Sequence, residues 1–122
     1  MLNKITSFTD LNAWKEGHKL VLNIYKQSKG FPKEELFSLT NQIQRSSVSI
    51  TSNIAECFSR RSNKEKLQFY YISLGSLTEV QNQLLVARDI GYIRKKDFKN
   101  IAEQTIIVSK LCNGLIKKIK NT

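Results

Sequence analysis

Apolar residues recur every three or four positions through four long stretches of the chain, a spacing that places them on one face of an α-helix. Residues that start or stop helices separate these stretches, among them Pro32, Ser62 and Gly91. The pattern therefore predicts four helices, at roughly residues 10–29, 34–60, 63–90 and 94–120. Because the connections are short, successive helices are expected to run antiparallel. The predicted fold is an all-α, up-down four-helix bundle, with residues 1–122 forming a single domain.

The first two predicted helices carry apolar rows suited to a shared core. Residues 10–29 place large side chains at Leu11, Trp14, Val21 and Tyr25. Residues 34–60 carry a longer row with spacings of four and three: Leu39, Ile43, Ser46, Ile50, Ile54 and Cys57. The middle of this helix, SSVSITS, is rich in β-branched and hydroxyl side chains of modest helix propensity. A β-strand over residues 46–54 is therefore the main alternative.

The last two predicted helices have comparable rows and stronger end signals. Ser62 and Glu65 fit a capping box, in which the serine hydroxyl meets a free amide and the glutamate reaches back to the serine amide. Gly91 suits the left-handed position that follows a helix end. The apolar rows are Tyr70, Leu74, Leu77, Leu84 and Ala87 in the third helix, and Ile101, Thr105, Val108, Cys112, Leu115 and Ile119 in the fourth.

Composition supports one small protein core. The chain has 122 residues, 40% of them hydrophobic, with one proline and two cysteines. Cys57 and Cys112 are too widely separated for a metal knuckle and fall on apolar helical faces, so we expect buried, reduced thiols rather than a disulfide. The sequence shows neither a signal-peptide pattern nor an apolar run of about 20 residues. We therefore expect a cytoplasmic protein that does not enter the membrane.

The chain is strongly basic. Twenty Lys and Arg against ten Asp and Glu give a formal charge of +10, which favours polyanions, with nucleic acid first and anionic membrane a weaker alternative. A simpler explanation is that the lysines only keep the protein soluble. The candidate nucleic-acid-binding residues surround two helix junctions and the chain end, and so fall at opposite ends of an up-down bundle: Arg60, Arg61, Lys64, Lys66, Arg94, Lys95, Lys96, Lys99, Lys117 and Lys118.

Such clusters can neutralise backbone phosphates without reading a base sequence. Tyr70, Tyr71 and Tyr92 are near enough to these clusters to stack on exposed bases. Both signals also have structural explanations, because tyrosines fill helical cores and lysines at helix ends complement the macrodipole.

A polar row follows residues 34–60 and has a counterpart in residues 63–90. Its members recur mostly every three or four positions: Gln42, Arg45, Ser49, Asn53 and Glu56, then Ser76, Glu79 and Gln83. Antiparallel pairing would bring Glu79 toward Arg45 or Asn53. The row is either an ordinary solvated face or a polar network inside an assembly. In an assembly, unpaired groups would cost about 1 to 3 kcal/mol each, so the network would fix the oligomer interface.

Residues suited to catalysis or metal binding are few and scattered. His18 is the only histidine and has no Cys, Glu or second His at metal-ligand spacing. The Glu-x-x-His pairs of carboxylate-bridged metal bundles are missing, and the five glycines form no phosphate-binding loop. We therefore expect a protein that is not an enzyme and uses no metal or cofactor. An ordered metal or cofactor beside His18 or Glu79 would reopen that question.

Two segments carry a family resemblance: FPKEELFSLTNQIQRSSVSITSNIAECFSRRS and FYYISLGSLTEVQNQLLVARDIGYI. Their most specific pieces are Phe31-Pro32, Leu39-Thr40-x-Gln42, Arg45, Ser49-Ile50, Asn53-Ile54-Ala55-Glu56 and Gly75-Ser76-Leu77-x-Glu79. Over roughly residues 10–120, the chain resembles the bacterial four-helix bundle proteins encoded in intervening sequences of 23S ribosomal RNA genes. It departs from their usual Asn-Ile-Ala-Glu-Gly by having Cys57 in place of the glycine, which suggests that the helix continues there without a special backbone requirement.

The resemblance implies an up-down bundle that assembles into a ring-shaped homopentamer. The family includes accessory proteins of diversity-generating retroelements that bind nucleic acid and a reverse transcriptase, and this sequence does not specifically indicate that branch. The favoured hypothesis is a homo-oligomeric, RNA-associated protein that binds mainly through phosphate contacts. The alternative is a protein-interaction or scaffold module that does not bind nucleic acid directly, and whose lysines serve solubility only.

Overall fold

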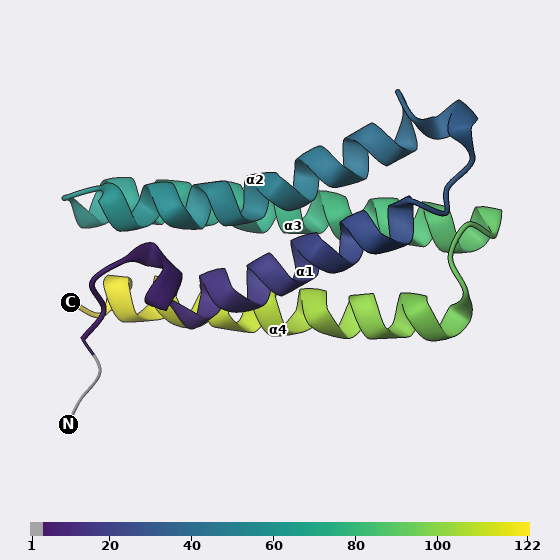
Figure 1. Ribbon diagram of the computed structural model, residues 1–122. Helices are drawn as coiled ribbons and strands as arrows, with labels where there is room; N and C mark the ends of the chain where they lie inside the picture. Colours follow the sequence, from purple (N-terminus) through teal and green to yellow (C-terminus); the bar gives the residue numbers. More distant parts are fainter. Residues whose placement is uncertain (1–3) are drawn as a thin grey trace.

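The computed structural model describes residues 4–122 and contains four antiparallel α-helices (Figure 1). Helix α1 spans Asn12–Ser28, α2 Leu39–Ser59, α3 Asn63–Ile90 and α4 Lys95–Lys120, with short 3₁₀ helices η1 at Phe8–Asp10 and η2 at Lys33–Glu35. Each α-helix packs against two others, α1 and α3 each contacting both α2 and α4. The 3₁₀ helix η1 and the C-terminus lie at the same end of the bundle as the α2–α3 junction (Figure 1). The predicted all-α up-down bundle is confirmed.

The segment for which a strand was the alternative is helical throughout. Ile50 and Ile54 are fully buried, and every member of the predicted α2 row lies in the core. The hydroxyls of this segment bond back to their own helix: Ser47 Oγ donates to the Gln44 carbonyl at 2.8 Å and Thr51 Oγ1 to the Val48 carbonyl at 3.1 Å. Packing and these internal hydrogen bonds outweigh the modest helix propensity of the segment.

Helix α2 begins at Leu39, five residues later than the predicted start at residue 34. Pro32 is extended, and the next residues form the 3₁₀ helix η2, closed by hydrogen bonds from the Glu35 and Leu36 amides to carbonyls three residues earlier. Ser38 then adopts a non-helical conformation (φ −127°, ψ −110°) before α2 starts. The acidic residues after Pro32 therefore open a separate turn and not the long helix.

The buried face of α1 matches the predicted one only in part, because Leu11 and Val21 are buried as expected but Trp14 and Tyr25 are not. Ala13, Gly17, Leu20 and Ile24 face the core, whereas Tyr25 is 39% exposed and Trp14 is only half-buried. Small residues occupy this face because α1 approaches α2 closely: a Cβ placed on Gly17 would lie 3.0 Å from a methyl group of Thr51. The predicted row was chosen from the largest side chains of the helix. Where α1 approaches α2 most closely, however, only a small side chain fits.

Local signals set both ends of α3. Ser62 Oγ accepts the Glu65 amide at 3.1 Å, as expected of a cap. The second half of the predicted box is wrong, because the Glu65 carboxylate accepts the Ser62 hydroxyl at 3.2 Å in place of the Ser62 amide. At the other end Gly91 has φ +94°, and its amide donates to the carbonyls of Ala87 and Arg88.

Candidate nucleic-acid interface

Two of the cations predicted at the α2–α3 junction are engaged within the chain. A guanidinium nitrogen of Arg60 donates to Glu56 Oε2 at 2.8 Å, and the group lies 4.6 Å from the centre of the Phe69 ring. Lys66 Nζ donates to the carbonyls of Cys57 and Phe58 at 3.2 and 3.4 Å, which satisfies free acceptors at the end of α2. These two side chains have structural roles that explain their charge.

The remaining cations at this end project into solvent. Arg61 and Lys64 are exposed at the junction, and Lys117 and Lys118 are exposed in the last turn of α4. Within the described part of the chain, none of the four lies within 4.0 Å of a carboxylate oxygen. The α4 terminus lies at the same end of the bundle as the α2–α3 junction (Figure 1). The lysines of α4 also complement the negative end of its macrodipole.

At the opposite end, Arg94 occupies the N-cap of α4 and Lys95, Lys96 and Lys99 follow it, all exposed. No side chain caps the free backbone amides of this first turn. Lysines here oppose the positive end of the macrodipole, so helix stability does not explain their presence. Asp97 is the one acidic residue of the turn and is half-buried.

The three tyrosines proposed to stack on bases differ in accessibility. Tyr70 is only 4% exposed and lies in the core, which makes stacking on a base impossible. Tyr92 donates its hydroxyl to Glu35 Oε2 at 2.8 Å and packs on Phe31, so it joins two loops at one end of the bundle. Tyr71 is exposed, with Lys120 Nζ 5.5 Å from its ring centre. Only Tyr71 keeps an open face, and Tyr25 adds an exposed ring on α1.

The polar rows of α2 and α3 come together. The hydroxyls of Ser49 and Ser76 are hydrogen-bonded at 2.8 Å, and Asn53 donates to the Ser49 carbonyl and hydroxyl at 2.8 and 3.1 Å. Ser46 Oγ donates to Glu79 Oε2 at 3.4 Å and accepts a hydrogen bond from Gln83 Nε2 at 3.3 Å. Glu79 lies near Arg45, with which it lines a shared cleft, but in the described chain it forms no ion pair with Arg45 within 4.0 Å and no hydrogen bond with Asn53. Its hydrogen-bond partner is Ser46, a residue that the sequence assigned to the apolar row.

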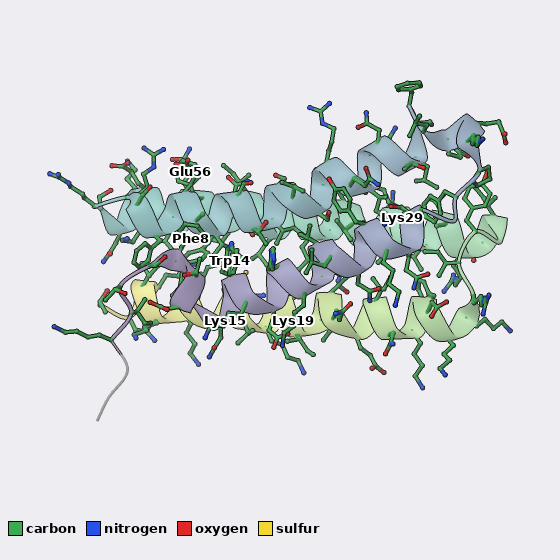
Figure 2. The ribbon with its side chains drawn as sticks, in the orientation of Figure 1. Phe8, Trp14, Lys15, Lys19, Lys29 and Glu56 are labelled. Atoms are coloured by element: carbon green, nitrogen blue, oxygen red, sulfur yellow. The ribbon has the colours of Figure 1, made fainter. Side chains whose placement is uncertain are left out.

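The outer members of these rows face solvent. Gln42, Arg45, Glu56 and Glu79 are exposed, and Glu56 projects from the outer side of α2 in Figure 2. A surface cleft of about 290 Å³ lies between the two helices, lined by Asn41, Gln42, Arg45, Ser46, Glu79 and Gln83. Among residues 4–122, the Oε1 atom of Gln83 is a buried acceptor without a hydrogen-bond partner.

The histidine and the two thiols occupy contrasting environments. His18 is exposed and stacks on Trp14 with ring centres 4.7 Å apart. Phe8 meets Trp14 edge-on, and Figure 2 shows these two residues next to each other. Cys57 and Cys112 are buried and free. Burial raises the pKa of both thiols, to about 11 for Cys112. Both cysteines are therefore protonated core residues at neutral pH.

Comparison with known proteins identifies the family of the chain. Residues 9–114 match the family described as 23S rRNA-intervening sequence protein. The chain belongs to this family. The match covers all of α1, α2 and α3 and most of α4. The resemblance inferred from the sequence is thereby confirmed.

A solved structure from the S23 ribosomal protein family has the same fold as this chain. It is a protein of unknown function from the S23 ribosomal protein family of Bacteroides thetaiotaomicron. The two superpose with a TM-score of 0.80 over 86% of this chain and 95% of the other, at 24% sequence identity. Likeness at that identity shows the fold alone. No curated protein matches the chain significantly.

Sequence reasoning overlooked the lysines of α1 in this family member. Lys15, Lys19 and Lys26 are exposed, and Figure 2 shows Lys15 and Lys19 in the first half of the helix and Lys29 at its far end. The spacing of four and seven between them was a signal that they share one helical face. Unlike the cations at the helix junctions, these lysines are not adjacent in the sequence and so form no visible cluster there. None of the four α-helices meets the length and hydropathy required to span a bilayer.

Proposed function

We propose that this family member is a non-enzymatic, homo-oligomeric, RNA-associated protein of the cytoplasm that binds RNA mainly through phosphate contacts. The start of α4 is the observation that carries the proposal. Arg94, Lys95, Lys96 and Lys99 are exposed there, and in the described chain none pairs with a carboxylate. Their repulsion from the helix dipole would be relieved by a bound phosphate, which the free amides of the same turn also attract.

Salt dependence of RNA binding tests this proposal. The logarithm of the binding constant should fall linearly with the logarithm of salt concentration, because each neutralised phosphate releases about one counterion. Replacing Arg94, Lys95 and Lys96 by glutamine should weaken binding and reduce the slope by up to about three. Absence of RNA binding at low salt, or a slope near zero, would contradict the proposal.

The oligomeric part of the proposal is supported by the α2–α3 face. Small hydroxyl residues there permit close approach of another surface, the buried Gln83 acceptor lacks a partner, and Ile72 and Val86 are exposed at 45% and 40%. The family resemblance leads us to propose a homopentamer. Light scattering should give about five times the chain mass of 14.1 kDa, and a monomer at micromolar concentration would contradict this part.

A protein-interaction module is the second candidate, and the α3–α4 groove favours it. This groove has a volume of about 470 Å³ and an almost wholly apolar lining, in which Leu85 and Ile106 are 42% and 48% exposed. Recovery of partners from native lysate before and after nuclease treatment separates the candidates. A protein partner retained after nuclease favours the interaction module, whereas loss of every partner favours RNA.

A further inference from the structure

Most of the net positive charge of the protein lies in one layer of the bundle. Helices α1 and α4 pack side by side and together carry ten lysines against three acidic residues, a net charge of +7. Helices α2 and α3 carry four cations against four acids, so the opposite layer is neutral. A surface whose lysines served solubility alone would not require this segregation.

Two rows of exposed lysines run along the charged layer. Lys15, Lys19 and Lys26 recur on α1 at spacings of four and seven, and α4 carries Lys99, Lys110 and Lys117 at spacings of eleven and seven. Each of these spacings returns to nearly the same side of an α-helix. Of the six, only Lys19 pairs with a carboxylate in the described chain, Glu16 at 3.4 Å. The rows join the basic start of α4 to its basic end, over about 39 Å for a helix of 26 residues.

The groove between the two helices is lined by amides. The four amides Asn23, Gln27, Asn100 and Gln104 line a hollow of about 360 Å³ together with Leu22, Lys26 and Asp97, and Asn23 Nδ2 donates to Gln104 Oε1 at 2.8 Å. Side-chain amides offer both donors and acceptors, which matches the ribose 2′-hydroxyl. Lys26 lines the same hollow, and a lysine beside a row of side-chain amides is suited to a ribose-phosphate backbone.

From these observations we infer that the α1–α4 layer is one continuous track for double-stranded RNA, an inference that rests on the proposed RNA function. Duplex RNA is recognised through its phosphates and 2′-hydroxyls, and known modules for it span about 16 base pairs. Single-stranded RNA needs successive aromatic platforms. Of the Phe, Tyr and Trp rings on the described α1 and α4, only Tyr25 is exposed, since Trp14 is half-buried and Arg88 lies over the half-buried Phe98.

A pair of charge-matched variants tests the track. In the first, Lys15→Gln and Lys26→Gln remove two cations from the charged layer. In the second, Ser52→Glu and Asn82→Glu add two acids at exposed positions on the neutral layer. Both lower the net charge from +10 to +8, so they differ only in where the charge changes. Melting curves and light scattering establish that each variant remains folded and keeps the mass of the parent.

The probes are an RNA duplex of about 16 base pairs and one of its strands alone. The parent should bind the duplex more tightly than the strand. The first variant should lose roughly tenfold in duplex affinity per contact near 0.1 M salt, with a slope reduced by up to about two, and the second should lose much less. Equal losses in both variants, tighter binding of the single strand, or binding of phosphatidylserine vesicles in place of RNA would overturn the track. If the parent bound no RNA at low salt, the proposed function would fail as well.

Discussion

At the scale of single residues, the buried thiol of Cys112 makes stability depend on alkaline pH. Burial raises its pKa from 9.0 to about 11 in the folded protein. Below pH 9 both folded and unfolded chains hold the proton, so the contribution of the thiol to stability is complete. As the pH rises from 9 to 11 the unfolded chain loses the proton first, which favours unfolding.

We therefore expect the free energy of unfolding to fall between pH 9 and 11, by about 2 kcal/mol from this thiol. Burial raises the pKa of Cys57 and Tyr70 too, so both contribute in the same direction. Urea denaturation at pH 8 and pH 11 measures the change. In Cys112→Ala the drop should be smaller by about the same amount, and an unchanged drop would show that this thiol is not responsible.

At the scale of elements, two glycines with opposite roles test how the helices end. Gly91 has φ +94° and terminates α3, so Gly91→Ala should destabilise the protein by about 1 kcal/mol. Gly114 lies within α4, and a Cβ there meets nothing within 4 Å. Gly114→Ala should therefore stabilise the protein by about 0.5 to 1 kcal/mol. Denaturant unfolding of both variants at pH 7 checks the signs, and equal effects would refute the assignment of Gly91.

The ends of a helix were predictable where capping residues in the sequence mark the same positions as the packing. Ser62 and Gly91 fix α3 at the expected residues because capping depends only on neighbouring backbone groups. The start of α2 was misplaced, since the chain after Pro32 adopts a 3₁₀ turn that acidic residues fit as well as an α-helix. The core face of α1 was predicted only in part, because Gly17 lies against Thr51 of α2 and side-chain size does not reveal such a contact between helices.

At the scale of the whole molecule, helices α1 and α4 together carry a net charge of +7, whereas helices α2 and α3 together carry none. This arrangement allows the neutral α2–α3 layer to approach another copy without strong repulsion, while the α1–α4 layer remains available for RNA. The sequence identified the basic residues at the bundle ends. It did not reveal that Arg60 and Lys66 are held by internal partners, or that α1 lies beside α4 and extends the charge between the ends. Both depend on tertiary contacts.

Lysine acetylation with and without duplex RNA, read residue by residue by mass spectrometry, tests this charge arrangement most directly. RNA should slow the modification of Lys15, Lys26, Lys99 and Lys110 on the α1–α4 layer. Lys33, which lies in η2 outside that layer, should react at the same rate in both samples. Equal protection of all five lysines, or no protection of any, would contradict the account.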